Sequence, residues 1–291
     1  MADFLKSIYW SVLRVLPDKP AVYLIYFRGY HKLLNLRNPR YLGEKIQWLK
    51  LYGHLEELAA YVDKYEVRKY VEQTIGTQYL NTLYGLYDTP EEIDYSVLPD
   101  QFVLKCTNGS GEILIVKDKS QFDVLKANRI MHGWLKDNFY KIKKEPQYKP
   151  VKNRIIAEAY LEDESGCLRD YKFFCFDGEP LYYSIYSDRF TNKTADVFDM
   201  TGKKLDGVSS GNIKNSNYTL PQPENFQELV EVVRKLAKPF QFVRVDFYIV
   251  NGCLYFGELT FTHGGGSDSY TPLEFDLEMA KRIKLGRLLK G

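Results

Sequence analysis

The fold of this chain is decided by one stretch near its C-terminal end: Phe240-Gln-Phe-Val-Arg-Val-Asp-Phe-Tyr-Ile-Val250, then Asn251-Gly252, then Cys253-Leu-Tyr-Phe-Gly-Glu-Leu259. The two flanking segments are rich in β-branched and aromatic residues, which is typical of strands. Asn-Gly is the strongest short signal for a two-residue hairpin, because both turn positions need positive φ. The stretch therefore predicts two antiparallel strands that lie side by side.

This hairpin brings acidic and basic side chains together in apolar surroundings. Arg244 and Asp246 are two residues apart and face the same side of their strand, and Glu258 and Thr260 repeat the spacing on the next strand. Two carboxylates that face one another repel unless a cation or a proton lies between them. Oxygen ligands beside phosphate are what Mg²⁺ prefers, so we interpret Asp246 and Glu258 as metal ligands. The simpler alternative is a salt bridge between Arg244 and Glu258 on an exposed sheet face.

Further strands and helices surround the hairpin. Strands are predicted at 101–105, 112–117, 154–160, 170–176, 181–186 and 195–199. Helices are predicted at 55–75, 120–139, 224–238 and 273–289, with a loop-rich segment at 77–100. Hairpins with helices interspersed favour an α+β fold over a doubly wound parallel sheet. The chain has no P-loop sequence, and its Gly-Ser-Gly turn at 109–111 joins two strands, which excludes a Rossmann site.

A second group of residues lies around that glycine turn, in Phe102-Val-Leu-Lys-Cys-Thr-Asn-Gly-Ser-Gly-Glu-Ile-Leu-Ile-Val-Lys117. Lys105 ends one strand and Lys117 ends the return strand. Glycines let backbone N–H groups approach phosphate oxygens, and Thr107 and Ser110 add hydroxyl donors. The pattern predicts an anion-binding turn; the alternative is an ordinary hairpin with solvated lysines.

A third group lies on the next two predicted strands. Glu158 and Tyr160 face one side of the first strand, and Asp170 and Lys172 alternate in the same way on the second. A charged side chain inside an apolar strand needs a partner. These residues therefore predict a second polar face near the hairpin.

Composition excludes some classes of function and leaves others open. The chain has 291 residues, 45% hydrophobic and 27% charged, with a net charge of +2, so it has no basic excess for binding nucleic acid. Residues 1–50 hold nine Lys or Arg and three Asp or Glu, a basic segment that fits either a solvated helix face or contact with a membrane. The four cysteines show no paired spacing for zinc, so we expect free thiols and a cytoplasmic protein, at the inner face of the membrane if the basic segment binds there.

The three groups of residues, taken in order, resemble the ATP-grasp enzymes, and most closely the TupA-like subfamily linked to teichuronopeptide and surface-polysaccharide synthesis. The resemblance spans roughly residues 36–290. It rests on these strings: Phe102-Val-Leu-Lys-Cys-Thr-Asn-Gly-Ser-Gly111, Ile155-Ile-Ala-Glu158, Asp170-Tyr-Lys-Phe-Phe-Cys-Phe-Asp-Gly178, Ser187-Asp-Arg189, Val243-Arg-Val-Asp-Phe-Tyr248 and Tyr255-Phe-Gly-Glu-Leu-Thr-Phe261.

The resemblance implies two sheet-bearing lobes that clasp ATP, preceded by a helical segment. We expect a helical region at 1–90, a small lobe with the glycine-rich phosphate loop at 91–161, and a large lobe with the metal site at 162–291. It also implies the residues that bind the nucleotide, which are Lys105, Thr107, Gly109, Ser110, Gly111, Lys117, Glu158, Ala159, Tyr160, Leu161, Asp170 and Lys172.

The same resemblance implies the cofactors and the reaction. Asp246 and Glu258 hold Mg²⁺ beside ATP, while Arg244 stabilises the acyl phosphate and the oxyanion. Many ATP-grasp enzymes have Glu-x-Asn where this chain has Glu258-Leu-Thr260. A threonine hydroxyl is a weaker metal ligand than an amide oxygen, so the sequence does not decide whether one or two Mg²⁺ ions bind. His263 precedes three glycines and fits either a catalytic base or a structural turn.

The expected function is an ATP-dependent carboxylate–amine ligase in cell-surface polysaccharide synthesis. Its partners are a small-molecule amine and a carboxylate-bearing sugar or glycan precursor. Arg189 fits either the acceptor carboxylate or a surface ion pair. The alternatives are a phosphotransferase on the same fold, a glycosyltransferase and a non-catalytic sugar-binding protein.

Overall fold

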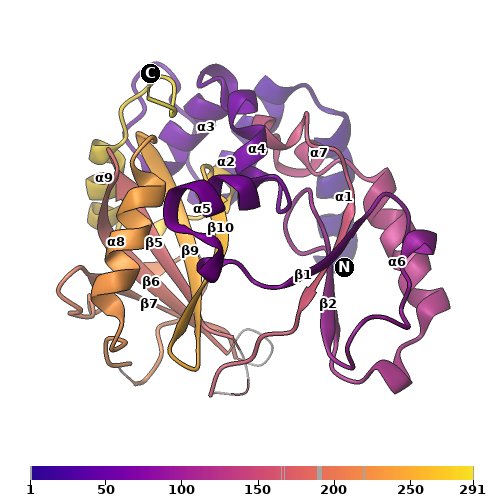
Figure 1. The fold of residues 1–291 in the computed structure, drawn as a ribbon. Helices are drawn as coiled ribbons and strands as arrows, with labels where there is room; N and C mark the ends of the chain where they lie inside the picture. The colour runs from indigo at the N-terminus through magenta and orange to yellow at the C-terminus, as the bar shows by residue number, and fades with distance from the viewer. Residues whose placement is uncertain (1, 165, 167, 189–191, 219, 291) are drawn as a thin grey trace.

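The computed structural model describes residues 2–164, 166, 168–188, 192–218 and 220–290, and for residues 2–7 only the backbone. Two antiparallel sheets organise the chain (Figure 1). The figure places them on opposite sides of the molecule, with helices α2 to α5 along the top. No helix among the described residues has the length and apolar content needed to cross a membrane.

The smaller sheet has the order β1-β4-β2-β3. Its strands are β1 (Leu83–Tyr87), β2 (Phe102–Cys106), β3 (Ile113–Val116) and β4 (Ile155–Ala159). Helix α6 (Val124–Lys136) covers it, and Ala127 and Met131 of that helix share a core with Phe102 and Leu104. Asp123 caps α6 by accepting a hydrogen bond from the Lys126 backbone, so the helix starts later than the predicted residue 120.

The larger sheet has the order β10-β9-β5-β6-β7. Its strands are β5 (Asp170–Phe176), β6 (Glu179–Ser187), β7 (Thr194–Asp199), β9 (Phe242–Val250) and β10 (Cys253–Thr260). A two-stranded pair, β8 (Ser209–Ser210) and β11 (Tyr270–Thr271), and helix α9 (Leu273–Arg282) complete this part.

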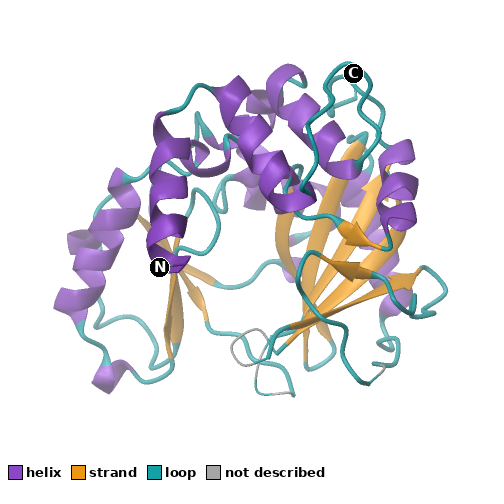
Figure 2. Ribbon diagram, turned by 180° about the vertical axis from the view of Figure 1, so that it is seen from behind, coloured by secondary structure: helices purple, strands orange, loops and turns teal. Residues whose placement is uncertain are grey.

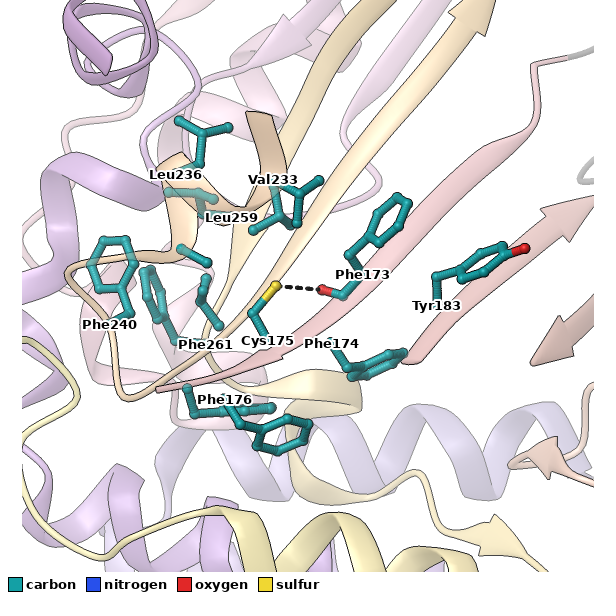
Figure 3. Packing of buried hydrophobic residues seen from close by; sticks show 14 of the residues in the cluster. Phe173, Phe174, Cys175, Phe176, Tyr183, Val233, Leu236, Phe240, Leu259 and Phe261 are labelled. Atoms are coloured by element: carbon teal, nitrogen blue, oxygen red, sulfur yellow. Dashed lines mark hydrogen bonds between the residues drawn. The ribbon is translucent and has the colours of Figure 1, made fainter. Parts of the chain in front are cut away.

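The core of the larger sheet is built on β5, in which every residue is buried because it lies in the middle of the sheet. Phe173 packs toward helix α8 (Phe226–Ala237), and Phe174 faces the opposite side, toward His263 (Figure 3). Cys175 is a free, buried thiol, as predicted for the cysteines. One face of the sheet is therefore apolar, and the other combines aromatic and charged groups.

The N-terminal helices are α1 (Ala2–Val15), α2 (Asp18–Tyr30), α3 (Leu42–Tyr52), α4 (Ala59–Val62) and α5 (Val67–Ile75). They join the C-terminal body through Asp276 of α9, which accepts hydrogen bonds from the Tyr30 hydroxyl at 2.7 Å and the Leu42 backbone at 2.8 Å. The short helix α7 (Tyr140–Lys143) follows α6.

Besides the later start of α6, the elements differ from the prediction in three places. The helix predicted at 55–75 is broken into a 3₁₀ turn, α4 and α5, although it does end at Gly76. Strand β1 lies in the segment predicted as loop and joins the small sheet. The last helix ends at Arg282 instead of residue 289, because Leu288 and Lys290 instead pair with backbone groups near Gln241 and Pro239.

Candidate functional site

A cleft lies between the two sheets, and nine of the predicted site residues line it. They come from β2, the glycine turn and the end of β3, from the end of β4 and the residues after it, and from β10. They are Lys105, Ser110, Gly111, Lys117, Glu158, Ala159, Tyr160, Leu161 and Glu258. Segments separated by more than a hundred residues therefore meet at one place, as the sequence predicted.

Glu158 organises the small-lobe wall of the cleft. Its carboxylate accepts from Lys105 Nζ at 2.7 Å and from Arg68 Nη1 at 3.2 Å, so this buried charge has two cationic partners. Arg68 also donates to the Asn81 carbonyl, and the Asn81 amide donates to the Ala159 carbonyl at 2.8 Å. These contacts fix the backbone of the segment that connects the two lobes. The sequence did not single out Arg68 or Asn81.

The glycine turn adopts a backbone that other residues rarely adopt. Gly109 has φ +91° and Gly111 has φ +98°, and a Cβ on Gly109 would lie 2.6 Å from the Phe139 ring. Thr107 is fully buried, and its hydroxyl donates to the Lys152 carbonyl at 3.0 Å. Its hydroxyl is thus used inside the protein, and Thr107 is not among the residues that line the cleft.

Besides Arg68, two charged residues of the cleft were not predicted. Lys64, between α4 and α5, donates from Nζ to the Gly109 carbonyl at 2.5 Å, and burial lowers the pKa of this lysine. Glu112 lies on the other side of the turn, and burial raises the pKa of its carboxyl. Its Oε2 is buried and has no hydrogen-bond partner among the described residues. A bound ligand or cation would supply the partner that this oxygen lacks.

The large-lobe wall contains a buried ion network. Asp246 is fully buried, and its carboxylate accepts from Arg244 Nε at 2.7 Å, from Arg244 Nη2 at 2.7 Å and from Lys172 Nζ at 2.5 Å. Lys172 also lies 3.4 Å from Asp170. Burial alone would raise the pKa of Asp246, but Arg244 and Lys172 lower it to about 2. Burial disfavours charged Lys172, yet Asp170 and Asp246 raise its pKa, so the network holds its charges in place.

Glu258 connects this network to the cleft. It lies opposite Asp246 in the β9–β10 ladder, and its Oε1 accepts from Arg244 Nη2 at 2.7 Å and from the Thr260 hydroxyl at 2.9 Å. Its side chain keeps 39% of its exposure and lines the cleft. The alternative prediction of a salt bridge between Arg244 and Glu258 is therefore confirmed. Its second part is wrong, because Arg244 is buried and this face of the sheet is not exposed.

A bulge at Gly257 produces this arrangement. The hairpin starts with Val250 opposite Cys253, and the register shifts by one residue between Phe256 and Glu258. Without the shift Glu258 would lie opposite Val245 and face the apolar side of the sheet. Gly257 suits the bulge because a Cβ there would lie 3.0 Å from the Asp246 carbonyl oxygen. The predicted proximity of Asp246 and Glu258 is confirmed, through a bulge that the sequence did not indicate.

His263 lies behind Arg244, and it does not line the cleft. Arg244 Nη1 donates to His263 Nδ1 at 3.0 Å, which leaves the ring proton on Nε2, 3.3 Å from the Tyr270 hydroxyl. Burial and the nearby Arg244 hold the pKa of His263 well below its usual range. The imidazole is therefore neutral at physiological pH and positions Arg244.

The glycines after His263 form a turn that lysines of α3 and α7 hold in place. Gly264, Gly265 and Gly266 all have positive φ. Lys50 Nζ donates to the Gly265 carbonyl at 2.8 Å, and burial lowers the pKa of this lysine to about 7. Lys143 of α7 donates to the Gly264 carbonyl at 3.0 Å. Helices α3 and α7 thus support the large-lobe wall from behind.

The predicted residues fall into three sets. The nine residues of the cleft form the first. A second set lies in or behind the walls: Thr107, Gly109, Asp170, Lys172, Arg244, Asp246, Thr260 and His263. Arg189 lies outside the described residues.

Comparisons with known proteins were made by sequence and by structure. No curated protein matches the sequence. Three solved structures show a distant similarity to this chain. D-alanine–D-alanine ligase from Bacillus anthracis complexed with ATP is 14% identical, with 75% of this chain and 56% of that chain covered and a TM-score of 0.39. L-amino acid ligase from Bacillus licheniformis is 15% identical, with 71% and 44% covered and a TM-score of 0.43.

The third structure is N5-carboxyaminoimidazole synthetase from Staphylococcus aureus complexed with ADP, which is 13% identical, with 76% and 52% covered and a TM-score of 0.46. The chain thus spans about half the length of these solved proteins. The model of the TupA-like ATPgrasp family matches residues 44–284, which include both sheets and the whole cleft. The chain, with its α+β ATP-grasp fold, belongs to the TupA-like ATP-grasp family.

Proposed function

We propose that this protein is an ATP-dependent carboxylate–amine ligase that works through an acyl phosphate. The observation that carries the proposal is the composition of the cleft. One wall presents a glycine turn with Lys64 and Lys105, and the other presents Glu258, held by the buried Arg244. A cleft with phosphate-binding groups on one wall and a carboxylate–arginine pair on the other suits phosphoryl transfer.

Apolar side chains in the cleft suit the adenine ring. Val103, Ile113 and Ile115 line it from the small sheet, and Tyr248 and Phe256 line it from the large one. Ile113 and Ile115 are 40% and 38% exposed, an unusual exposure for isoleucines on a strand. A flat ring held between these walls would cover them, with backbone groups of residues 159–161 beside it.

The donor set of the cleft fits Mg²⁺ bound together with phosphate oxygens. Among the described residues, no three His, Cys, Asp or Glu side chains form a metal cage. Mg²⁺ commonly uses one or two carboxylates, water and substrate phosphates instead. Glu258 presents its carboxylate to the cleft and would be the first ligand, with Thr260 beside it. Asp246 would join only by exchanging one of its cationic partners. When bound, Mg²⁺ would screen the phosphate charge and polarise the γ-phosphate.

Arg244 is the residue that we assign to charge stabilisation. A substrate carboxylate oxygen attacks the γ-phosphorus, the bond to the β-phosphate oxygen breaks, and ADP and an acyl phosphate result. The amine then attacks the acyl carbon, loses a proton, and phosphate leaves. Negative charge develops on oxygen in both steps. Arg244 is held by Asp246, Glu258 and His263, so its charge is oriented before the reaction starts.

The substrates in this proposal are an amino acid or similar amine and the carboxylate of a uronic acid or peptide, in the synthesis of a surface polysaccharide. Membership of the TupA-like family supports this class. The test is ADP release by the purified protein with ATP, Mg²⁺ and a matrix of uronic acids and amines. The proposal expects release that needs both the acid and the amine. ADP release that needs the acid and leaves a stable phosphorylated product without the amine would contradict it and identify a phosphotransferase.

A further inference from the structure

Helices α1 and α2 expose apolar side chains to an unusual extent. Val15 is 82% exposed, Phe27 52% and Leu33 85%. Ile8, Val12 and Val15 form an exposed stripe at helical spacing on α1. Tyr23, Leu24 and Phe27 form a second exposed stripe on α2, and Leu33 follows that helix. We call these side chains, with Leu33, the hairpin face.

The hairpin face consists of outward-pointing side chains of a well-packed unit. Leu13 of α1 packs with Ala21 and Ile25 of α2 on the inner side. Arg14 forms a two-pronged ion pair with Asp137, at 2.5 and 2.7 Å, that ties α1 to the segment before α7. Figure 2 shows α1 rising from the N-terminus on the near side of the molecule. The inner sides of α1 and α2 are therefore packed, and among the described residues no side chain covers the two outer stripes.

The exposed charged residues of the segment that carries the hairpin face are all basic. Between residues 8 and 40 the acidic residue is Asp18, which is half-buried and accepts a hydrogen bond from Tyr140. Arg14 is paired with Asp137. The other basic residues of this segment are exposed: Lys19, Arg28, Lys32, Arg37 and Arg40.

We infer that the hairpin face docks on an anionic membrane surface. Exposed apolar side chains bordered by Lys and Arg are typical of interfacial helices, in which the apolar groups enter the headgroup region and the cations stay near the phosphates. A second copy of the chain would bring the same positive charges against these, and like charges across a two-fold interface repel. The charge pattern therefore favours lipid over self-association.

The experiment is flotation of the full chain with vesicles of phosphatidylcholine alone and with phosphatidylglycerol mixed in. We expect binding to the anionic vesicles only, weakened by added salt. Lys19→Gln, Arg37→Gln and Arg40→Gln together should weaken it on the order of a hundredfold, at about fivefold for each charge. Val15→Ser, Phe27→Ser and Leu33→Ser together should weaken it about tenfold or more.

The matched control is Val97→Ser with Leu125→Ser. Val97 and Leu125 are 74% and 73% exposed but lie elsewhere on the molecule, so their loss should leave vesicle binding unchanged. All variants alter exposed side chains, and circular dichroism checks that each folds. Absent or charge-independent vesicle binding overturns the inference. So does a dimer, seen by sedimentation, that the Val15, Phe27 and Leu33 substitutions dissociate, because the hairpin face would then be a contact between copies.

Discussion

Replacing Asp246 with Asn tests the buried ion network most sharply. The Asp246 carboxylate is fully buried and is the shared partner of Arg244 and Lys172. An amide of the same shape carries no charge to balance these two cations. Arg244 and Lys172 hold the pKa of Asp246 at about 2 against an ordinary 3.8. A pKa lower by nearly two corresponds to roughly 2–3 kcal/mol in favour of the charged form.

Breaking a buried ion pair typically costs about 3–5 kcal/mol, because it leaves an uncompensated buried charge. We therefore expect Asp246→Asn to lower the free energy of unfolding by about 3–5 kcal/mol. The assay is urea unfolding at neutral pH, followed by circular dichroism. Lys172→Met provides a double-mutant cycle, in which the two changes together cost less than their sum, since both remove the same ion pair.

The matched control is the pair between Arg234 and Glu179. Its atoms are 2.8 Å apart, close to the distances in the network, but its side chains are 46% and 58% exposed. Glu179→Gln should cost less than about 1 kcal/mol. If Asp246→Asn costs no more than this control, the network does not hold its charges as described, and the reasoning fails.

Three further predictions concern the cleft and its support. Gly109→Ala places a Cβ 2.6 Å from an aromatic ring at φ +91°, so we expect the KM for ATP to rise about tenfold, measured by steady-state kinetics. The pKa of His263 is held low, so below about pH 6.5 the unfolded chain binds a proton that the folded protein excludes, and the free energy of unfolding falls by about 1.4 kcal/mol per pH unit. Urea unfolding from about pH 6.5 downward should show this slope, and His263→Gln should flatten it. Gly257→Val places a Cβ 3.0 Å from the Asp246 carbonyl oxygen and so disfavours the bulge that keeps Glu258 opposite Asp246; ATP turnover and stability should both fall, whereas an unchanged rate would refute the role of the bulge.

The larger sheet could be predicted because its signals are local. The Asn251-Gly252 turn has φ +50° and +75°, as an Asn-Gly hairpin requires, and β5 coincides with the predicted 170–176. Strand β1 could not be predicted in the same way. It is short, contains Gly85, and its register with β4 is irregular, so its pairing depends on a partner some seventy residues away.

In the candidate site, too, residues with a local sequence signal were predicted and residues that depend on distant partners were not. Lys105 and Glu158 were predicted from strand alternation and from resemblance, and they meet in the cleft. Lys64 and Arg68 were missed because the pattern of their segment indicates only a helix, and their partners are 45 and 90 residues away. The side of the sheet that Glu258 faces depends on one bulge, which reverses the alternation that a sequence pattern assumes.

The central claim is that the cleft forms an acyl phosphate on a carboxylate substrate. Hydroxylamine tests it most directly, because it attacks an acyl phosphate and leaves a hydroxamate that can be quantified. The protein is incubated with ATP, Mg²⁺, uronic acids and hydroxylamine, beside Glu258→Gln, whose partly exposed side chain should allow normal folding. We predict hydroxamate and ADP in equal amounts from the wild type and at least a hundredfold less, on the order expected for loss of a charge-stabilising group, from the variant. ADP without hydroxamate, or equal rates from both proteins, would contradict the account.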